Sequence, residues 1–369
     1  MFEQDIKEDL LYLMLYVGVT VLSLVACCYL LFRRANAIAP DVTPPLRLRR
    51  WTAAFLACAT LSHLWYMPLL YLTSADDVKM LYFICALLDF LTVFPLAIVV
   101  LFTMLQDRKR PLWPIGVMMA PLVVGMVVCI VTRSDAILPT LYAYYLLMAV
   151  GLIIFMVRAV RQYGRWLRDN YADLEYKEVW QSLVVLFIIL AAFSLYAFEL
   201  HGTYYKYAVQ TIVFFLICFL VWRVETLSDL NPRDAQASSA EIVEETVKEV
   251  PSLVADDKIG ALLQKHCIDT QLYLQHDLTL HQLAKAVGTN RFYLSQYFSQ
   301  QNITYNGYIN GLRIDHFMAL YRKVVAAGQS FTVKQLAQDS GYRNYTTFSN
   351  AFKQRMGKNV KAWMQEDEA

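Results

Sequence analysis

Seven apolar runs, each about as long as a membrane is thick, constrain this chain more than any other feature of its sequence. They lie at roughly residues 10–32, 51–72, 80–103, 113–131, 138–159, 180–200 and 207–222. A helix needs about 20 apolar residues to cross about 30 Å of hydrocarbon. We therefore expect residues 1–224 to form a domain of seven transmembrane helices.

The composition and the first run agree with a membrane domain. Hydrophobic residues make up 57% of the 369 residues and charged residues only 17%, with a mean hydropathy of +0.38. The first run follows acidic residues and precedes Arg33 and Arg34, whereas a secretory signal carries its basic residues before the apolar core. The first run is therefore predicted to be a spanning helix and not a cleaved signal.

The basic residues of the loops predict how the spans are oriented. Thirteen Lys and Arg residues fall in the first, third and fifth connections, and four fall at the N-terminus and in the even connections. Loops rich in Lys and Arg stay on the cytoplasmic side of the membrane. We expect a multi-pass protein of the inner (cytoplasmic) membrane, with its N-terminus outside and its C-terminal part in the cytoplasm, in contact with the lipid bilayer.

Ionisable residues within the apolar runs are candidates for sensing a signal. His63 and Asp89 lie about 15 to 17 Å from the outer ends of consecutive spans, within reach of each other. A charge in hydrocarbon costs at least about 2.5 kcal/mol, so ionisable residues there need a role. They either form a hydrogen bond between helices or belong to a centre that senses a ligand or a proton. Glu199, near the outer end of the sixth run, is a further candidate. Tyrosines such as Tyr66 and Tyr82 fit an interfacial belt or the lining of an outward pocket.

Residues 225–257 form an acidic stretch that separates two parts of the chain. Nine Asp and Glu residues stand there against two Lys and Arg residues, and small residues are frequent. We expect a flexible linker, and about 30 flexible residues have an r.m.s. span of roughly 30 Å. A weak dimerising helix over residues 239–250 is the alternative, which leaves a homodimer open.

A two-helix pattern occurs twice in residues 258–369, where thirteen basic residues stand against seven acidic ones. Each copy has apolar residues at helical spacing, a glycine turn, and a second helix with two apolar anchors. The first copy has Leu280, Leu283, Ala284, Val287, Gly288, Leu294 and Phe298. The second has Val333, Leu336, Ala337, Gly341, Phe348 and Phe352. A helix with an apolar stripe, predicted over Tyr305–Ala326, should hold the two copies a fixed distance apart.

These residues resemble the DNA-binding domain of the AraC/XylS family of bacterial transcription regulators. The resemblance covers about 100 residues, 258–364. It is carried by Thr279-Leu280-x-x-Leu283-Ala284-x-x-Val287-Gly288, by Leu312-Arg313-Ile314, and by Ser340-Gly341-Tyr342-x5-Phe348-x3-Phe352-Lys353-x3-Gly357. One departure is that Asn359-Val360 stands where that family usually has a proline. The resemblance implies two helix-turn-helix units that bind double-stranded DNA.

The resemblance also implies which residues contact DNA. The exposed face of the first recognition helix would be Arg291, Phe292, Ser295 and Gln296. That of the second would be Tyr345, Thr346, Ser349 and Asn350. Gln and Asn suit adenine edges, and aromatic rings can contact thymine methyl groups. Phosphate contacts are expected from Arg343, Lys353 and Lys358.

The expected architecture is all-α: a seven-span transmembrane sensor domain (1–224), the acidic linker (225–257) and a cytoplasmic AraC-type double helix-turn-helix domain (258–369). The expected function is transcription regulation, in which the spans detect an unknown small-molecule or physical signal. The alternatives are a transporter-like or enzyme-like membrane protein with a DNA-binding appendage, and a tethered factor released by proteolysis of the linker.

Sequence motifs argue against the enzyme and transporter alternatives. The chain has no His-Glu-x-x-His, no Gly-x-Ser-x-Gly and no glycine-rich phosphate loop. Its seven cysteines show no paired spacing. No catalytic residue, metal or other cofactor is therefore expected. The spans show no obvious pair of interrupted helices at equivalent positions, although Pro68 and Pro95 could break two of them.

Overall fold

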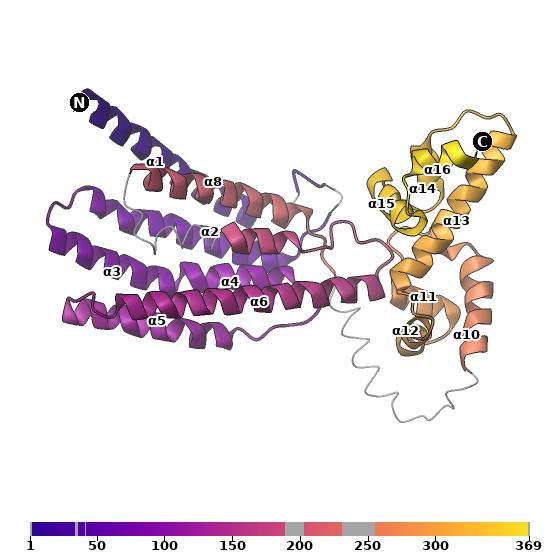
Figure 1. The fold of residues 1–369 in the computed structure, drawn as a ribbon, viewed down its shortest axis with the longest axis horizontal. Coiled ribbons are helices and arrows are strands. Elements are labelled where there is room, and N and C mark those ends of the chain that lie inside the picture. Colours follow the sequence, from indigo (N-terminus) through magenta and orange to yellow (C-terminus); the bar gives the residue numbers. More distant parts are fainter. Residues whose placement is uncertain (1, 34–35, 41, 189–202, 231–254, 368–369) are drawn as a thin grey trace. The chain divides into compact units, whose positions relative to one another are not determined.

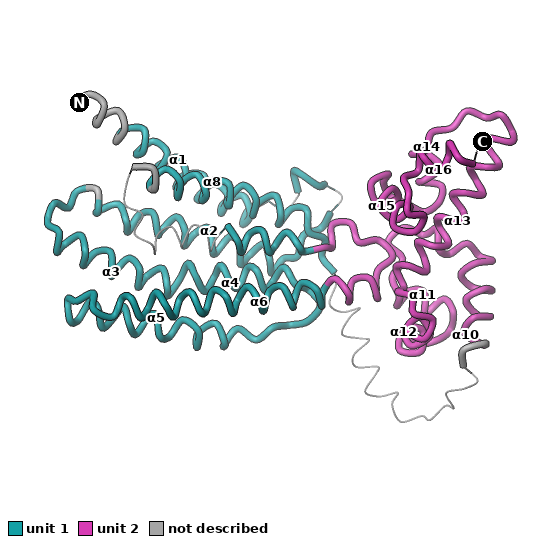
Figure 2. Tube along the Cα trace, viewed as in Figure 1, with its two compact units in different colours: residues 1–163, 179–230 teal, residues 164–178, 231–369 magenta. Residues whose placement is uncertain are grey.

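The structure is a computed structural model that describes residues 2–33, 36–40, 42–188, 203–230 and 255–367 (Figure 1). In these residues every regular element is a helix, which confirms the all-α class. The chain divides into two compact units (Figure 2). Unit 1 comprises residues 1–163 and 179–230, and unit 2 comprises residues 164–178 and 231–369.

Unit 1 is a bundle of long helices. They are α1 (Phe2–Phe32), α2 (Leu46–Tyr66), the 3-10 helix η1 (Met67–Leu70), α3 (Ala75–Leu91), α4 (Val93–Met104), α5 (Trp113–Thr132), α6 (Leu138–Asn170) and α8 (Thr203–Thr226). Helix α1 packs against α2 and α8, α2 packs against α4, and α3 packs against α5. Helix α6 ends in unit 2, because residues from Gly164 onward belong to that unit.

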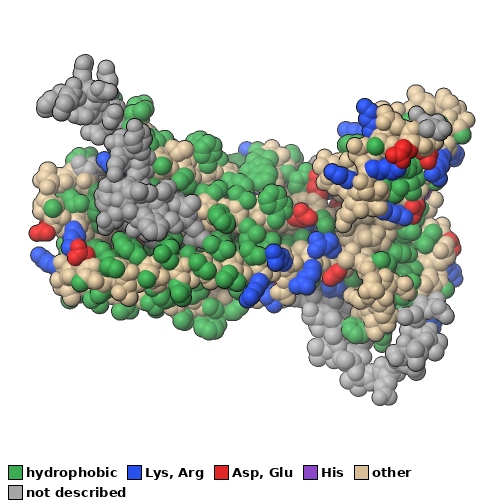
Figure 3. Space-filling model, viewed as in Figure 1, with side chains coloured by type: hydrophobic (Ala, Val, Ile, Leu, Met, Phe, Trp, Pro, Cys, Tyr) green, Lys and Arg blue, Asp and Glu red, His purple; other side chains and the backbone are tan. Residues whose placement is uncertain are grey.

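Five helical segments among the described residues are long and apolar enough to cross a membrane. They are Leu10–Phe32, Ala75–Met104, Trp113–Thr132, Leu138–Asn170 and Lys206–Thr226. Only 22% of the most apolar window of the first segment is buried. Hydrophobic side chains cover much of the visible face of unit 1 (Figure 3), and an exposed apolar surface of this extent fits lipid better than water.

Two of the seven predicted spans are not among these five segments. Helix α2, the second run, carries Arg47, Arg49 and Arg50 in its first turns, so its apolar part begins only at Trp51. The sixth run is helical over residues 181–188, and residues 189–202, including Glu199, lie outside the described residues. The number seven therefore remains a prediction.

The third run, predicted as one span over 80–103, consists of two helices that meet at Thr92. The backbone of Thr92 has φ −125° and ψ −69°, outside the helical region. Pro95 follows in the first turn of α4, where its ring would clash with the carbonyl of Leu91 and its nitrogen has no proton to donate. Pro68 similarly stands where α2 gives way to η1. Both prolines therefore interrupt helices.

Unit 2 contains the two predicted helix-turn-helix units. Its helices are α10 (Ala255–Leu263), the π-turn η2 (Gln264–Ile268), the 3-10 turn η3 (Leu272–Leu274), α11 (Leu280–Val287), α12 (Arg291–Gln300), α13 (Tyr305–Ala326), α14 (Val333–Asp339), α15 (Tyr345–Met356) and α16 (Val360–Asp367). The connecting helix α13 has the predicted bounds. Gly288 and Gly341 make the predicted turns with φ of 75° and 90°, which favour glycine.

Side-chain caps explain where these helices begin. The hydroxyl of Thr279 accepts a hydrogen bond from the backbone of Gln282, whose side chain accepts one from the backbone of Thr279 in return. Thr332 caps α14 through its hydroxyl. Before α16, Asn359 accepts a hydrogen bond of 2.8 Å from the backbone of Ala362. Asparagine thus starts the last helix at the position where the resembling family usually has a proline.

Helix α13 joins two hydrophobic cores. Ile309 lies in the first core, with α11 and α12. Ile314, Phe317 and Tyr321 lie in the second, with α14, α15 and α16. Because one helix supplies both cores, the two helix-turn-helix units form one body.

Residues 164–178, which we call the connector, also belong to this body. Ala172 is buried in the first core, and its backbone donates a hydrogen bond of 3.1 Å to the carbonyl of Leu278. Arg313 of α13 is fully buried, and its Nη1 lies 2.9 Å from Oδ1 of Asp173. The connector lies within residues 1–224, which the sequence predicts to be the transmembrane domain. Its packing shows that the helix-turn-helix unit extends to a segment about 100 residues upstream in the chain.

The buried ion pair predicts a large stability difference between two similar substitutions. Asp173→Ala should lower the free energy of local unfolding of α13 by about 3 kcal/mol, because it leaves the buried guanidinium of Arg313 without its carboxylate partner. Asp315→Ala removes an exposed partner of Arg355 and should cost less than about 1 kcal/mol. Hydrogen exchange of α13 peptides, measured on the full chain in detergent, distinguishes them. If both substitutions lowered the free energy of local unfolding of α13 by the same small amount, the structural role of the connector would be contradicted.

Candidate functional site

The first recognition helix, α12, presents most of its predicted DNA-contacting residues to solvent. Its cap is Asn290, whose Oδ1 accepts a hydrogen bond of 3.0 Å from the backbone of Tyr293. Phe292 is 55% exposed and Gln296 is exposed, while Ser295 is half-buried. Arg291 differs, since its guanidinium is half-buried and donates a hydrogen bond to Oδ1 of Asn170 in the connector. Burial lowers the pKa of Arg291 from its ordinary value.

The second recognition helix, α15, is built in the same way. Asn344 caps it by accepting a hydrogen bond of 2.9 Å from the backbone of Thr347. Phe348 and Phe352 are buried and hold the helix on the second core. The predicted contact residues on the opposite face are exposed, except Ser349, which is half-buried: Tyr345, Thr346, Ser349, Asn350 and Lys353.

The turn before α15 needs glycine for a second reason besides its φ angle. A Cβ atom on Gly341 would lie 2.8 Å from Cα and 2.9 Å from the carbonyl oxygen of Leu274. Nothing lies within 4 Å of the equivalent position on Gly288. The second turn therefore packs directly on the segment before α11, which fixes how α15 is presented.

Two of the predicted phosphate contacts are engaged in ion pairs. Arg343 pairs with Asp277 at 3.0 Å, and Lys177 of the connector pairs with the same carboxylate at 3.0 Å. Burial disfavours ionisation of Asp277, but the two cations outweigh it and hold its pKa below the ordinary value. Lys358 pairs with Glu366 of α16. These contacts leave Lys353 as the exposed lysine on the recognition face of α15.

The connector also supplies a residue that sequence reasoning missed. Oε2 of Glu175 accepts hydrogen bonds from Nδ2 of Asn344 and, at 3.2 Å, from Oγ1 of Thr347. Asn344 is the N-cap of α15 and Thr347 lies in its first turn. No local pattern around Glu175 points to this contact, because its partners lie about 170 residues further along the chain.

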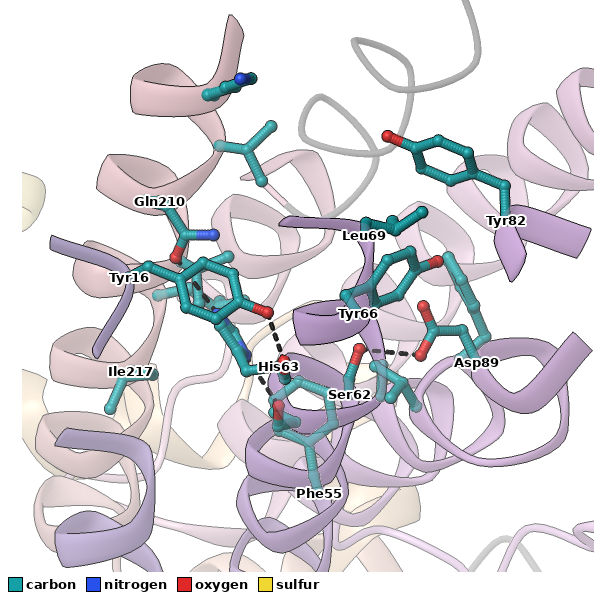
Figure 4. A pocket seen from close by; sticks show the side chains of 18 of the residues that line it. Tyr16, Phe55, Ser62, His63, Tyr66, Leu69, Tyr82, Asp89, Gln210 and Ile217 are labelled. Carbon is teal, nitrogen blue, oxygen red and sulfur yellow. Dashed lines mark hydrogen bonds between the residues drawn. The ribbon is translucent and has the colours of Figure 1, made fainter. Parts of the chain in front are cut away.

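Unit 1 contains a pocket with a volume of about 410 Å³, lined by residues of α1, α2, α3, α4 and α8 (Figure 4). This size lies within the usual range of small-molecule sites, about 300 to 1,000 Å³. Its polar lining is Tyr12, Tyr16, Ser62, His63, Tyr66, Tyr82, Asp89, Lys206 and Gln210. Its apolar lining includes Phe55, Phe94, Val213 and Ile217.

The structure places His63 and Asp89 in this one pocket but bonds them to different partners. Asp89 accepts a hydrogen bond of 2.9 Å from the hydroxyl of Ser62. His63 Nδ1 lies 2.8 Å from the carbonyl of Ala59, and Nε2 lies 3.1 Å from Oε1 of Gln210. Nε2 contacts the side-chain amide of Gln210 and so links α2 to α8. Both ring nitrogens are thus engaged without Asp89.

The pocket does not resemble a metal centre. Among the residues that the structure describes, no three His, Cys, Asp or Glu side chains lie close enough together to hold a metal ion. The polar groups of the pocket are instead hydroxyl, amide, imidazole, carboxylate and ammonium groups spread over an apolar cavity. Such a lining suits a small organic molecule.

Comparison with known proteins gives one match. Neither the curated proteins nor the solved structures that were searched match this chain. A family model described as a helix-turn-helix domain matches residues 283–366, which include both recognition helices and α13. This match supports the AraC/XylS resemblance and identifies the C-terminal part of the chain as a DNA-binding helix-turn-helix domain of the kind that transcription regulators carry.

Proposed function

We propose that the chain is a membrane-embedded transcription regulator with seven spans, whose C-terminal domain binds specific double-stranded DNA at the cytoplasmic face of the inner membrane. The observation that carries the proposal is the pair of recognition helices held by α13, in a chain whose described residues include five apolar helical segments. The loop charges support the orientation, because they place the basic unit on the side of the chromosome.

The arrangement of unit 2 supports reading of two neighbouring grooves. A recognition helix enters the major groove with its N-terminal residues against base edges. With both helices held by α13, one domain would read two successive major grooves on one face of the duplex, about 34 Å apart. The expected binding site is a pair of different submotifs about ten base pairs apart.

Two substitutions should separate base reading from phosphate contact. Gln296→Ala should relax the base preference at one position and cost about 1 to 3 kcal/mol on the preferred duplex, because an amide suits an adenine edge. Lys353→Ala should weaken binding to all sequences alike and lower the salt slope by about 1. The measurement is the affinity of the full chain in detergent for duplexes it has selected from a random pool. If each variant lost the same affinity for selected and for random duplexes, the assignment of Gln296 to base reading would be contradicted.

We further propose that the pocket of unit 1 receives the signal, a small organic molecule. The supporting observation is that Gln210 of α8 closes one side of the pocket by its contact with His63. Fifteen residues further along α8, about 22 Å at 1.5 Å per residue, buried Glu225 accepts hydrogen bonds of 3.0 Å from the backbones of Ala37 and Ile38. A ligand that separates Gln210 from His63 would therefore act on a helix that ends at the linker.

Substitutions in the pocket should fix transcription in one state. His63→Ala and Asp89→Asn should leave membrane insertion and the DNA affinity of the chain intact but abolish the response of a target-promoter reporter to its inducing condition. The matched control is Ser23→Ala, which removes an interhelical hydrogen bond of 2.9 Å to Leu56 outside the pocket and should leave the response unchanged. A normal reporter response in both pocket variants, at wild-type protein level, would rule out the sensing role.

A further inference from the structure

The connector contacts the N-terminal ends of both recognition helices, which are the ends that enter DNA. Asn170 binds Arg291 at the start of α12, and Glu175 binds Asn344 and Thr347 at the start of α15. We propose that the connector and DNA compete for these ends, so that the connector is a built-in inhibitor of DNA binding. The inference rests on the proposed function, since it assumes that α12 and α15 read DNA.

The chemistry at α15 is the chemistry that a DNA phosphate would use. A helix N-terminus carries unpaired backbone N–H groups and a positive partial charge, so it attracts anions. The carboxylate of Glu175 supplies one negative charge there and is held by an amide and a hydroxyl donor. A phosphate oxygen would need the same donors. Glu175 would also repel a phosphate brought to this position, so the two cannot occupy it together.

The cations beside the two helix ends are engaged as well. Arg291 at α12 must leave Asn170 and regain water before it can reach a base or phosphate. Arg343, before α15, is paired with Asp277, which Lys177 of the connector holds in place. The middle of each recognition face stays exposed, as Gln296 and Asn350 show. The connector therefore blocks the ends of the recognition helices and leaves their outer faces open.

The connector has a buried anchor followed by a strained turn. Ala172 and Asp173 are buried and anchor it to the first core and to Arg313. The following turn is strained, because Tyr176 adopts a positive φ of 58°, which is costly for a residue with a side chain. A shift of this turn can therefore take Glu175 away from α15 while the anchor at Ala172 and Asp173 stays in place.

The position of the connector in the chain makes it a route for the signal. It begins with the last turns of α6, which ends at Asn170, and is followed after two residues by the helical residues 181–188 at the start of the predicted sixth span. Both flanking segments belong to unit 1. A shift of one predicted span against the other would thus pull on residues 174–178 directly, without passing through the linker.

The test is the DNA affinity of the full chain in detergent, measured on duplexes that the wild-type chain selects from a random pool. Glu175→Ala should bind these duplexes at least about fivefold more tightly than wild type, because it removes the competing carboxylate. The matched control is Glu178→Ala, which removes the same charge from an exposed position three residues away. It should stay within about twofold of wild type, which separates local competition from net charge.

The outcomes separate this inference from the proposed function. If Glu175→Ala binds no more tightly than Glu178→Ala, the competition is refuted while specific DNA binding stands. If none of the three proteins prefers its selected duplexes to random ones, the proposed function itself fails. Hydrogen exchange of the wild-type chain gives a second readout. Saturating DNA should protect α12 and α15 and speed exchange in residues 174–178, and unchanged or slower exchange there would overturn the proposal.

Discussion

The guanidinium of Arg313 is the interaction on which the C-terminal unit depends. It is fully buried, donates hydrogen bonds of 2.7 and 2.8 Å to the carbonyls of Tyr273 and Gln275, and pairs with Asp173. Its charge also lies over the ring of Tyr342, next to the turn at Gly341. A buried cation is tolerated only where its partners are complete. This one side chain therefore ties together α13, the segment before α11, the second turn and the connector.

The ion pair of Arg313 with Asp173 connects the helix-turn-helix unit physically to the predicted spans. A domain joined only through a flexible linker would respond to the membrane part mainly through its position near the bilayer. The connector instead brings a segment between two predicted spans into the core of the helix-turn-helix unit. Glu175 in its outer turn reaches the start of α15, so under the proposal a small displacement there would change which groups are available to DNA.

The helix-turn-helix unit could be predicted from sequence because its signals are local. The glycine turns and the apolar spacing of α11 and α13 each act over a few residues. The contacts of Asp173 and Glu175 could not be predicted in this way. Their partners lie about 140 and 170 residues further along the chain, and no periodic pattern marks the connector.

The structure of unit 1 could be predicted less completely, for related reasons. Hydropathy finds apolar runs but not the break at Thr92, where the effect of Pro95 decides that one run becomes two helices. His63 and Asp89 could be singled out because they are ionisable residues in apolar runs. Their partners could not, since the contact of His63 with Gln210 depends on how α2 and α8 pack, 147 residues apart in sequence.

The central claim is that an intact, membrane-embedded chain occupies specific DNA, and its most direct test is a map of that DNA in living cells. Membranes would be isolated after cross-linking, the full-length chain captured, and the attached DNA sequenced. We expect discrete promoter-proximal sites, each containing two different submotifs about ten base pairs apart. Recovered DNA that is spread evenly over the chromosome, or site-specific DNA found only on fragments released from the membrane, would contradict it.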